Sequence, residues 1–250
     1  MQVVVQNLIT NCSLTGKGKL VLLLHGWGDT LQGLDVIQKS LSRHFQVLAL
    51  DLPGFGNTEA PRAVWGLDEY GHFVADTLKK LELGPVYSII GHSNGGAIAV
   101  RAISQHTLMP ERLILLAASG VRSGQSAKRL TFQVIAKTGN IATAWLPDRY
   151  RGALRKCLYK AAGSDYFVMP QLQETFKKTV RQDVQADAKK IGVLTLLIYA
   201  ADDAAVPISY GRRYQQLIKN SRLVIIDNGG HFLHQSQSAQ VLSHIERFLS

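Results

Sequence analysis

Short runs of apolar residues recur along the chain, each bounded by polar or glycine-containing segments. Because the runs are almost continuously apolar, they are typical of strands buried on both faces of a sheet. Six of them predict strands: VLLL (21–24), VLAL (47–50), VYSII (86–90), LILLA (113–117), VLTLLIY (193–199) and LVII (223–226). The opening segment, MQVVV, predicts a further, antiparallel strand at one edge of the sheet.

Helical periodicity occupies most of the intervals between these strands. Apolar residues three or four positions apart predict helices over 34–41, 67–81, 214–218 and 241–249. An alternation of strands and helices favours parallel strands with helices packed on both faces. The sequence therefore predicts an α/β fold with a mostly parallel, doubly wound sheet.

The alternation stops between residues 119 and 190. No strand-like run appears there, and the segment YRGALRKCLYKAAG (150–163) has a helical pattern. Four apolar residues also recur at every fourth position: Leu172, Phe176, Val180 and Val184. We interpret residues 121–190 as a helical cap inserted into an α/β core formed by residues 1–120 and 191–250.

The composition is that of a globular protein rather than a disordered one. Of 250 residues, 46% are hydrophobic and 18% are charged. The apolar runs are far shorter than the ~20 residues that cross a bilayer, and no secretory signal precedes the first strand. Cys12 and Cys157 form neither a metal-ligand pattern nor a disulfide scaffold. We therefore expect a cytoplasmic protein that needs no metal or organic cofactor.

A serine lies within the glycine-rich segment GHSNG (91–95), which fits the pattern G-x-S-x-G. The segment follows a predicted strand and precedes the small-residue helix start GGAIAVRAI. This strand–turn–helix context is that of a nucleophile elbow, in which a strained turn presents the serine hydroxyl. We interpret Ser93 as a candidate nucleophile; the alternative is a serine in an ordinary turn.

A serine hydroxyl needs a base to accept its proton, and the base needs a carboxylate to orient it. Both groups are expected after later strands, in the order Ser, acid, His. The loop after the fifth predicted strand contains Asp202 and Asp203, and the loop after the sixth contains His231. The carboxyl ends of parallel strands lie at the same sheet edge, which brings these loops together.

Acyl transfer also needs two backbone N–H groups that stabilise the negative charge on the carbonyl oxygen. One is expected from the residue after the nucleophile, Asn94. The other is expected from the loop HGWGD (25–29), where the N–H of Trp27 is the candidate donor. We interpret His25 and His92 as structural residues of their turns, and His234 as a bystander.

Five motifs in this order resemble the α/β-hydrolase superfamily: HGWG, DLPGFGNT, GHSNGG, AADDAAVP and GGHF. The resemblance covers essentially the whole chain. It implies a Ser–Asp–His triad and a helical cap inserted after the strand that ends near residue 118. The superfamily spacing G-x-x-D-x-x-V-P favours Asp203 as the acid, although Ala200 replaces the glycine, and Asp202 remains the alternative.

Within the superfamily, HGWG and DLPGFG resemble carrier-protein methyl ester esterases, although His92 stands where those enzymes have tryptophan. LILLAASGVRSG resembles hydrolases that cleave C–C bonds of ring-fission products. We expect a carboxylesterase-like serine hydrolase that forms an acyl-enzyme. The alternatives are a C–C hydrolase, a carrier-protein methyl ester esterase, and a receptor that binds a ligand without turnover.

Positive charge is concentrated in the expected cap. The net charge is +10, and residues 121–190 hold 14 Lys and Arg against 5 Asp and Glu. Two clusters stand out: Arg149, Arg151, Arg155, Lys156 and Lys160, and then Lys177, Lys178 and Arg181. These clusters would attract an anionic ester, an acidic carrier protein or an anionic membrane surface; alternatively they form a solvated face. No nucleic-acid-binding motif accompanies the charge, and the sequence leaves the oligomeric state open.

Overall fold

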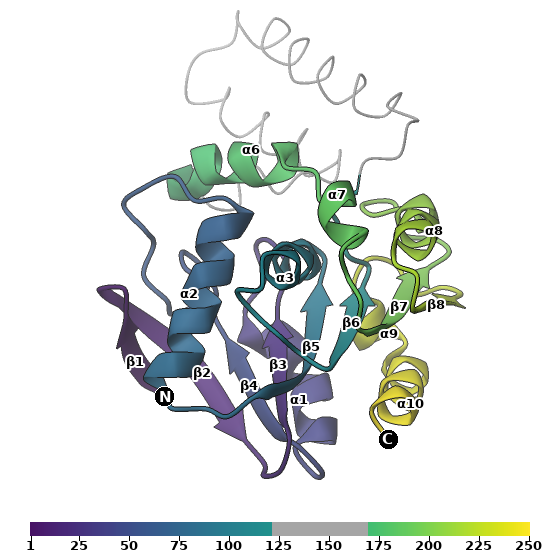
Figure 1. Cartoon of the computed structure of the whole chain (residues 1–250), viewed down its shortest axis with the longest axis horizontal. Helices are drawn as coiled ribbons and strands as arrows, with labels where there is room; N and C mark the ends of the chain where they lie inside the picture. Colours follow the sequence, from purple (N-terminus) through teal and green to yellow (C-terminus); the bar gives the residue numbers. More distant parts are fainter. Residues whose placement is uncertain (122–169) are drawn as a thin grey trace, which may run out of the picture.

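A computed structural model of the chain describes residues 1–121 and 170–250, and an eight-stranded sheet runs through this part (Figure 1). The strand order is β1-β2-β4-β3-β5-β6-β7-β8. The pairs β1·β2 and β2·β4 are antiparallel, and the other pairs are parallel. The strands are β1 (Gln2–Val5), β2 (Leu8–Thr15), β3 (Leu20–Leu24), β4 (Gln46–Leu50), β5 (Val86–His92), β6 (Arg112–Leu116), β7 (Leu194–Ala200) and β8 (Ser221–Ile226).

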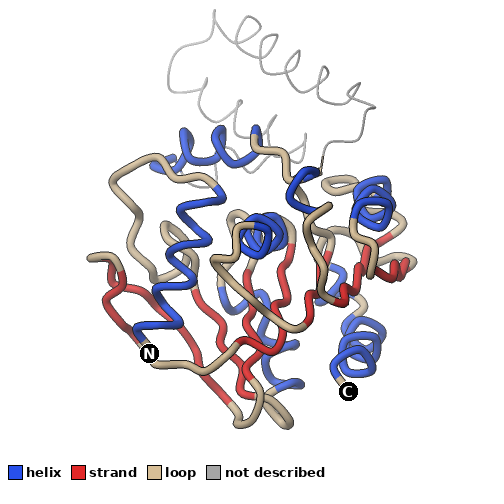
Figure 2. The backbone as a smooth tube through the Cα atoms, viewed as in Figure 1, coloured by secondary structure: helices blue, strands red, loops and turns tan. Residues whose placement is uncertain are grey.

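Helices cover both faces of the sheet, as Figures 1 and 2 show. One face buries an apolar cluster beneath α2 (Leu67–Lys80), α3 (Asn94–Ser104) and α8 (Ile208–Leu217). The other face buries a cluster beneath η1 (Leu31–Leu34), α1 (Asp35–Leu41), α9 (Leu233–Ser236) and α10 (Ser238–Leu249). The central strands β3 and β5 are buried along their whole length, which explains their continuous apolar sequences.

The strand predictions are confirmed for all six buried runs and for the antiparallel edge strand β1. The sequence missed β2, which pairs with both β1 and β4. Its residues LITNCSLT alternate between buried and more exposed positions, so it has no continuous apolar run. The turn that joins β1 to β2 places Gln6 and Asn7 at positive φ, as a two-residue hairpin requires.

The described part of the expected cap is helical: η3 (Pro170–Leu172), α6 (Gln173–Arg181) and α7 (Gln185–Ala188). The four apolar residues at every fourth position do not share one helix: Leu172 lies in η3, Val180 lies in α6 and is 57% exposed, and Val184 precedes α7. Helix α6 ends at Arg181, and the next residue, Gln182, is extended. The side chain of Gln182 instead accepts a hydrogen bond from the N–H of Leu67 at the start of α2. The rest of the predicted cap, including the helix over 150–163, lies outside the described residues.

Two groups of polar contacts hold α6 and α7 against the core. Lys178 of α6 bonds to Glu69 of α2 at 2.8 Å. Arg101 of α3 bonds both to Asp187 of α7, at 2.9 Å, and to Asp68 of α2, at 3.2 Å. These contacts place α6 at the end of the core where the parallel strands terminate (Figure 1). Within the described ranges, no helix is long and apolar enough to cross a membrane.

Candidate active site

Ser93 occupies a sharp turn between β5 and α3. Its backbone has φ 51° and ψ −116°, a conformation that L-residues other than glycine rarely adopt. The turn is held by a hydrogen bond from the N–H of Ser93 to the carbonyl of Leu116 at 3.0 Å. Its carbonyl in turn accepts bonds from the N–H groups of Gly96 and Ser119, at 3.1 Å each. The backbone around Ser93 is therefore fixed in a strained state.

The glycines on either side of Ser93 are required by close backbone packing. A Cβ on Gly91 would lie 2.6 Å from the Cα of Gly96. A Cβ on Gly95 would lie 2.3 Å from the carbonyl oxygen of Leu24. Contacts shorter than 3 Å to backbone atoms cannot be relieved by a side-chain movement, so both positions need glycine. The G-x-S-x-G pattern thus reflects how tightly the turn packs against β3 and α3.

The structure brings Ser93, His231 and Asp203 together from three loops. The Nε2 atom of His231 lies 3.1 Å from the Oγ of Ser93. The Nδ1 atom of His231 lies 2.8 Å from the Oδ2 of Asp203. Both distances are those of hydrogen bonds. The imidazole of His231 therefore joins a hydroxyl 138 positions away in the sequence to a carboxylate 28 positions away.

The two neighbouring aspartates have different contacts. The Asp203 side chain is fully buried, and its Oδ1 accepts hydrogen bonds from the N–H groups of Ala205, at 2.8 Å, and Val206, at 2.9 Å. Asp202 is exposed, and it accepts hydrogen bonds from the N–H groups of Gly229 and Gly230 at 3.0 Å each. The bond from Gly230 is the main reason that the pKa of Asp202 is lowered. Asp202 thus holds the loop before His231, whereas Asp203 contacts His231 itself.

The loop after β3 runs against the serine turn. A Cβ on Gly26 would lie 3.1 Å from the Cβ of Ser93, so the backbone that leads to Trp27 passes beside this residue. Gly28 has φ 75°, which allows this loop to turn. Asn94 is the first residue of α3, where a backbone N–H has no acceptor within the helix. Asn94 therefore adjoins Ser93 in the turn, and Trp27 directly follows the glycine that packs against Ser93.

The side chains of these two residues also carry unused donors. Trp27 Nε1 and Asn94 Nδ2 are buried, and neither has a hydrogen-bond partner among the described residues. The Trp27 ring packs against Phe55 of the DLPGFG loop and against Phe176 of α6, with ring centroids 4.9 and 5.1 Å apart. Helix α6 is thus in contact with the loop that borders Ser93.

Three further histidines surround the site, and all are buried. His25 contacts the carbonyl of Gly26 through Nδ1 and accepts a bond from the N–H of Leu52 at Nε2, so both its nitrogens have partners. Burial lowers the pKa of His92 well below its usual value, and it lowers the pKa of His234 to about 4. Both rings are therefore neutral at pH 7. His234, which we expected to be a bystander, is 0% exposed and packs against His92, with ring centroids 4.6 Å apart.

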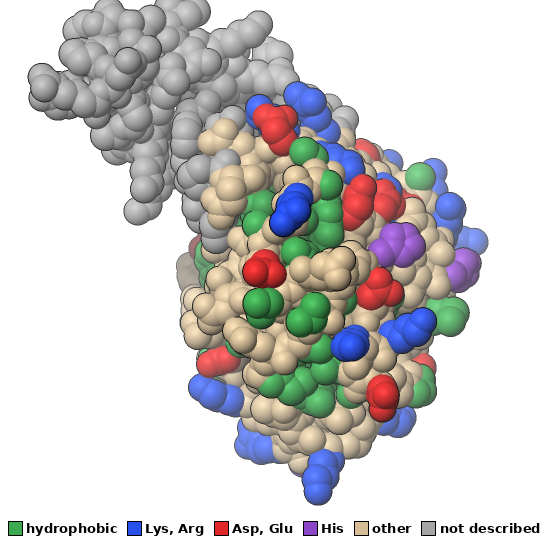
Figure 3. Space-filling view, turned by 90° about the vertical axis from the view of Figure 1, so that its left-hand side faces the viewer, with side chains coloured by type: hydrophobic (Ala, Val, Ile, Leu, Met, Phe, Trp, Pro, Cys, Tyr) green, Lys and Arg blue, Asp and Glu red, His purple; other side chains and the backbone are tan. Residues whose placement is uncertain are grey.

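The basic residues of the described part of the cap are partly neutralised. Lys177 bonds to Glu174 at 2.6 Å, and Lys178 bonds to Glu69 at 2.8 Å. On the face shown in Figure 3, basic and acidic side chains of the described residues are interspersed. The other basic cluster, which begins at Arg149, lies outside the described residues. The charge of the described helices alone therefore does not make a strongly positive rim.

Three kinds of comparison agree with this fold. The model of the alpha/beta hydrolase family matches residues 21–244. A 2-hydroxy-6-oxo-2,4-heptadienoate hydrolase of Pseudomonas putida is 26% identical, over 96% of this chain and 92% of that protein. A pimeloyl-[acyl-carrier protein] methyl ester esterase of Nitrosomonas europaea is 27% identical, over 94% of this chain and 95% of that protein.

Among solved structures, a bacterial membrane phospholipase A superimposes with a TM-score of 0.81 at 22% identity, covering 100% of this chain and 84% of that one. The meta-cleavage product hydrolase of Pseudomonas fluorescens gives a TM-score of 0.76 at 22% identity, covering 99% of this chain and 96% of that one. The family match spans most of the sequence, and the eight-stranded sheet has the architecture expected from it. The chain therefore belongs to the alpha/beta hydrolase family.

Proposed function

We propose that this hydrolase is a serine hydrolase that acts on carboxylic esters through an acyl-enzyme. The observation that carries the proposal is the continuous chain of hydrogen bonds from Ser93 through His231 to the buried carboxylate of Asp203. In this arrangement the base contacts the nucleophile, and the orienting carboxylate contacts the base, which is the geometry of acyl transfer by serine.

In the first half-reaction, the Ser93 oxygen attacks the ester carbonyl carbon while Nε2 of His231 takes the hydroxyl proton. Asp203 holds Nδ1–H of the imidazole and stabilises the imidazolium that forms. The N–H groups of Trp27 and Asn94 bind the oxyanion of the tetrahedral intermediate. The intermediate then collapses: the bond to the alkoxy oxygen breaks, and the proton on His231 passes to the leaving alcohol.

In the second half-reaction, water attacks the acyl-enzyme, and Nε2 of His231 now accepts a proton from the water. A second tetrahedral intermediate forms and collapses. The proton returns to the Ser93 oxygen, and the carboxylic acid leaves. The buried donors Trp27 Nε1 and Asn94 Nδ2 are suited to bind an acceptor oxygen elsewhere on the substrate.

Two narrower activities are supported by relatives of the chain. The Pseudomonas putida relative is named as a hydrolase of a 2-hydroxy-6-oxo-dienoate, which favours C–C bond hydrolysis as the second candidate. The Nitrosomonas europaea relative is named as an esterase for a carrier-protein-linked methyl ester. Both substrates are anionic or bound to a protein, which would suit the positive charge of residues 121–190.

A graded panel of substrates tests the proposal. The panel contains aryl and methyl esters of increasing acyl length, with and without an anionic head group, and one vinylogous diketone of the ring-fission type. We expect hydrolysis of esters and labelling of Ser93 by a fluorophosphonate probe, both lost in Ser93→Ala. Faster turnover of the diketone would favour the C–C hydrolase. If the probe fails to label Ser93 while a ligand binds tightly, the protein is a receptor and the proposal is wrong.

A further inference from the structure

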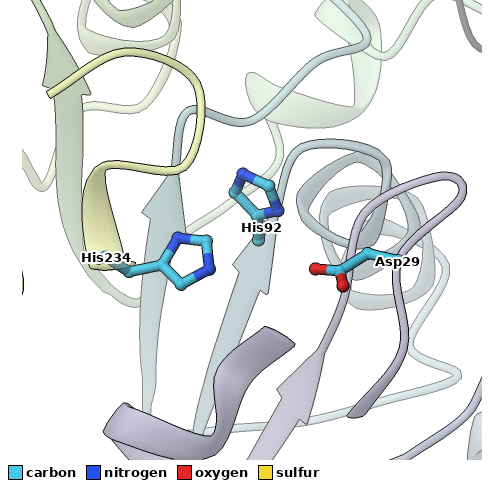
Figure 4. Close-up of side chains that lie close together, drawn as sticks. All are labelled: Asp29, His92 and His234. Carbon is cyan, nitrogen blue, oxygen red and sulfur yellow. The ribbon is translucent and has the colours of Figure 1, made fainter. Parts of the chain in front are cut away.

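A second cluster of polar side chains lies behind the serine turn, and the proposed hydrolysis does not use it. Asp29 follows β3, His92 ends β5, and His234 belongs to α9 (Figure 4). The three side chains point toward one another in Figure 4. One potential ligand atom from each residue lies within 4.8 Å of those of the other two. Three separate segments of sequence thus bring metal-ligating groups to one point.

The cluster contains three buried polar atoms that have no partner among the described residues: Oδ2 of Asp29, Nδ1 of His92 and Nδ1 of His234. Both histidines are nearly inaccessible, with exposed fractions of 1% and 0%. A buried polar atom that makes no hydrogen bond costs about 1–3 kcal/mol, and a charged one costs more. A ligand that contacts all three atoms would remove this cost.

The hydrogen bonds on the far side of each ring determine what that partner must be. Nε2 of His92 lies 3.0 Å from the carbonyl oxygen of His231, and Nε2 of His234 lies 3.1 Å from that of Gly33. A carbonyl oxygen only accepts, so both Nε2 atoms carry the proton. With the proton on Nε2, Nδ1 is the ring atom with a free lone pair, and in both rings it has no partner among the described residues. A backbone carbonyl that fixes the tautomer is also the usual support of a metal-bound histidine.

All three unpartnered atoms are consequently acceptors, and no donor of the described residues reaches them. A single water molecule could donate to only two of them. A cation would bind all three and would offset the carboxylate charge. From these contacts we propose that Asp29, His92 and His234 form a binding site for a divalent metal ion of the zinc class. Two imidazole nitrogens and one carboxylate oxygen favour zinc over magnesium, which prefers oxygen ligands alone.

The local backbone packs closely against these atoms, at two positions occupied by glycine. A Cβ on Gly26 would lie 3.0 Å from His92 Nδ1, and a Cβ on Gly33 would lie 2.2 Å from Asp29 Oδ2. Zinc binds nitrogen and oxygen at about 2.0–2.2 Å, so tetrahedral ligand atoms lie about 3.4 Å apart. The ligand atoms therefore need to approach one another by at most about 1.4 Å when the ion binds. The fourth position would be left to water, since three protein ligands do not complete a tetrahedron.

The site would tie the serine turn to the loop that carries His231. His92 immediately precedes Ser93, and its Nε2–H donates to the backbone of His231. An ion on Nδ1 polarises the ring and strengthens this bond. The expected consequence is a more stable connection between β3, β5 and α9. From the sequence we expected no metal site.

The test uses the full-length protein after treatment with a chelator. We expect equilibrium dialysis with Zn²⁺ to give one ion per chain, and Mg²⁺ to give none. Zinc should also raise the thermal midpoint. Asp29→Asn and His234→Gln should each weaken zinc binding at least about 10-fold, since each removes a ligand. The matched control is His72→Gln, an exposed histidine on α2, which should bind zinc like the parent.

Three outcomes would overturn the site. The first is that the parent protein retains no more zinc in dialysis than Asp29→Asn does. Another is loss of the ion in His231→Gln, which would place zinc on the proposed catalytic base instead. X-ray absorption of the zinc-loaded parent protein provides a test that does not depend on whether buried variants fold. Two imidazole ligands per zinc are expected there, and fewer than two would contradict the proposed ligand set.

Discussion

The carboxylate of Asp203 and the imidazole of His231 lie 2.8 Å apart, and the carboxylate is fully buried. The neighbouring carboxylate, Asp202, faces solvent and bonds to backbone N–H groups before His231. Asp203→Asn should therefore lower kcat by about 10⁴-fold, because an amide no longer holds the productive tautomer of His231. Steady-state kinetics on an aryl ester provide the measurement.

Asp202→Asn is the matched control. It keeps the shape of the side chain and an acceptor oxygen for Gly229 and Gly230, so we expect a loss of less than about 10-fold. If Asp202→Asn were the more damaging change, the orienting acid would be Asp202, and the assigned relay would be wrong.

The backbone of Ser93 offers a test of stored strain. A residue other than glycine at φ 51° costs about 1–3 kcal/mol, and alanine at this position remains strained. Both Ser93→Ala and Ser93→Gly should reduce ester hydrolysis by at least about 10⁴-fold. Ser93→Gly should nevertheless be more stable than Ser93→Ala by about 1 kcal/mol in urea unfolding.

A control pair on α10 should behave in the opposite way. Ser243 is exposed in the interior of that helix, where glycine is about 0.5 kcal/mol or more worse than alanine. Ser243→Gly should therefore be less stable than Ser243→Ala. Equal stability of the two Ser93 variants would show that the turn is not strained.

The positive charge of residues 121–190 gives a prediction about salt. If this segment attracts anionic substrates, kcat/KM for an anionic ester should fall steeply as ionic strength rises from about 0.01 M to 1 M, because the screening length shrinks from about 30 Å to 3 Å. A neutral ester of the same acyl length should show little change. A flat response for both esters would mean that the charge serves solvation alone.

Acid should weaken the contacts that Asp68 of α2 makes with α3. Burial raises the pKa of Asp68, but its hydrogen bonds to Gln105 and Arg101 outweigh that effect and lower it overall. A carboxyl whose pKa is lower in the folded state stabilises the fold above its unfolded pKa, about 3.9, and this stabilisation is lost as pH falls through the folded value. The free energy of unfolding should therefore decrease below about pH 4, and Asp68→Asn should make this decrease smaller.

Urea unfolding between about pH 3 and pH 6 measures this effect. The control is Asp76→Asn, at an exposed position of the same helix where the carboxylate bonds to Gln6. An identical pH dependence in Asp68→Asn and the parent protein would show that the contact of Asp68 with Arg101 does not stabilise the fold.

The sequence alone determined the buried strands, because a strand covered on both faces needs a continuous apolar run. It also determined the G-x-S-x-G turn, since Gly91 and Gly95 meet neighbouring backbone too closely for any side chain. Strand β2 was missed because only some of its residues are buried. Its sequence therefore has no continuous apolar run that distinguishes it from a polar loop. The buried strands and the serine turn could be predicted because each depends on residues that are neighbours in the sequence.

Other features depend on distances between residues far apart in the sequence. The choice between Asp202 and Asp203 as the partner of His231 rested on spacing and was open until one carboxylate was seen to be buried and the other exposed. No pattern linked Asp29, His92 and His234, because they come from three elements that only the folded sheet brings together. The sequence determines which side chains each loop contains. The order of the parallel strands β3, β5 and β8 in the sheet determines which of these side chains come into contact, because the loops follow the same edge of the sheet.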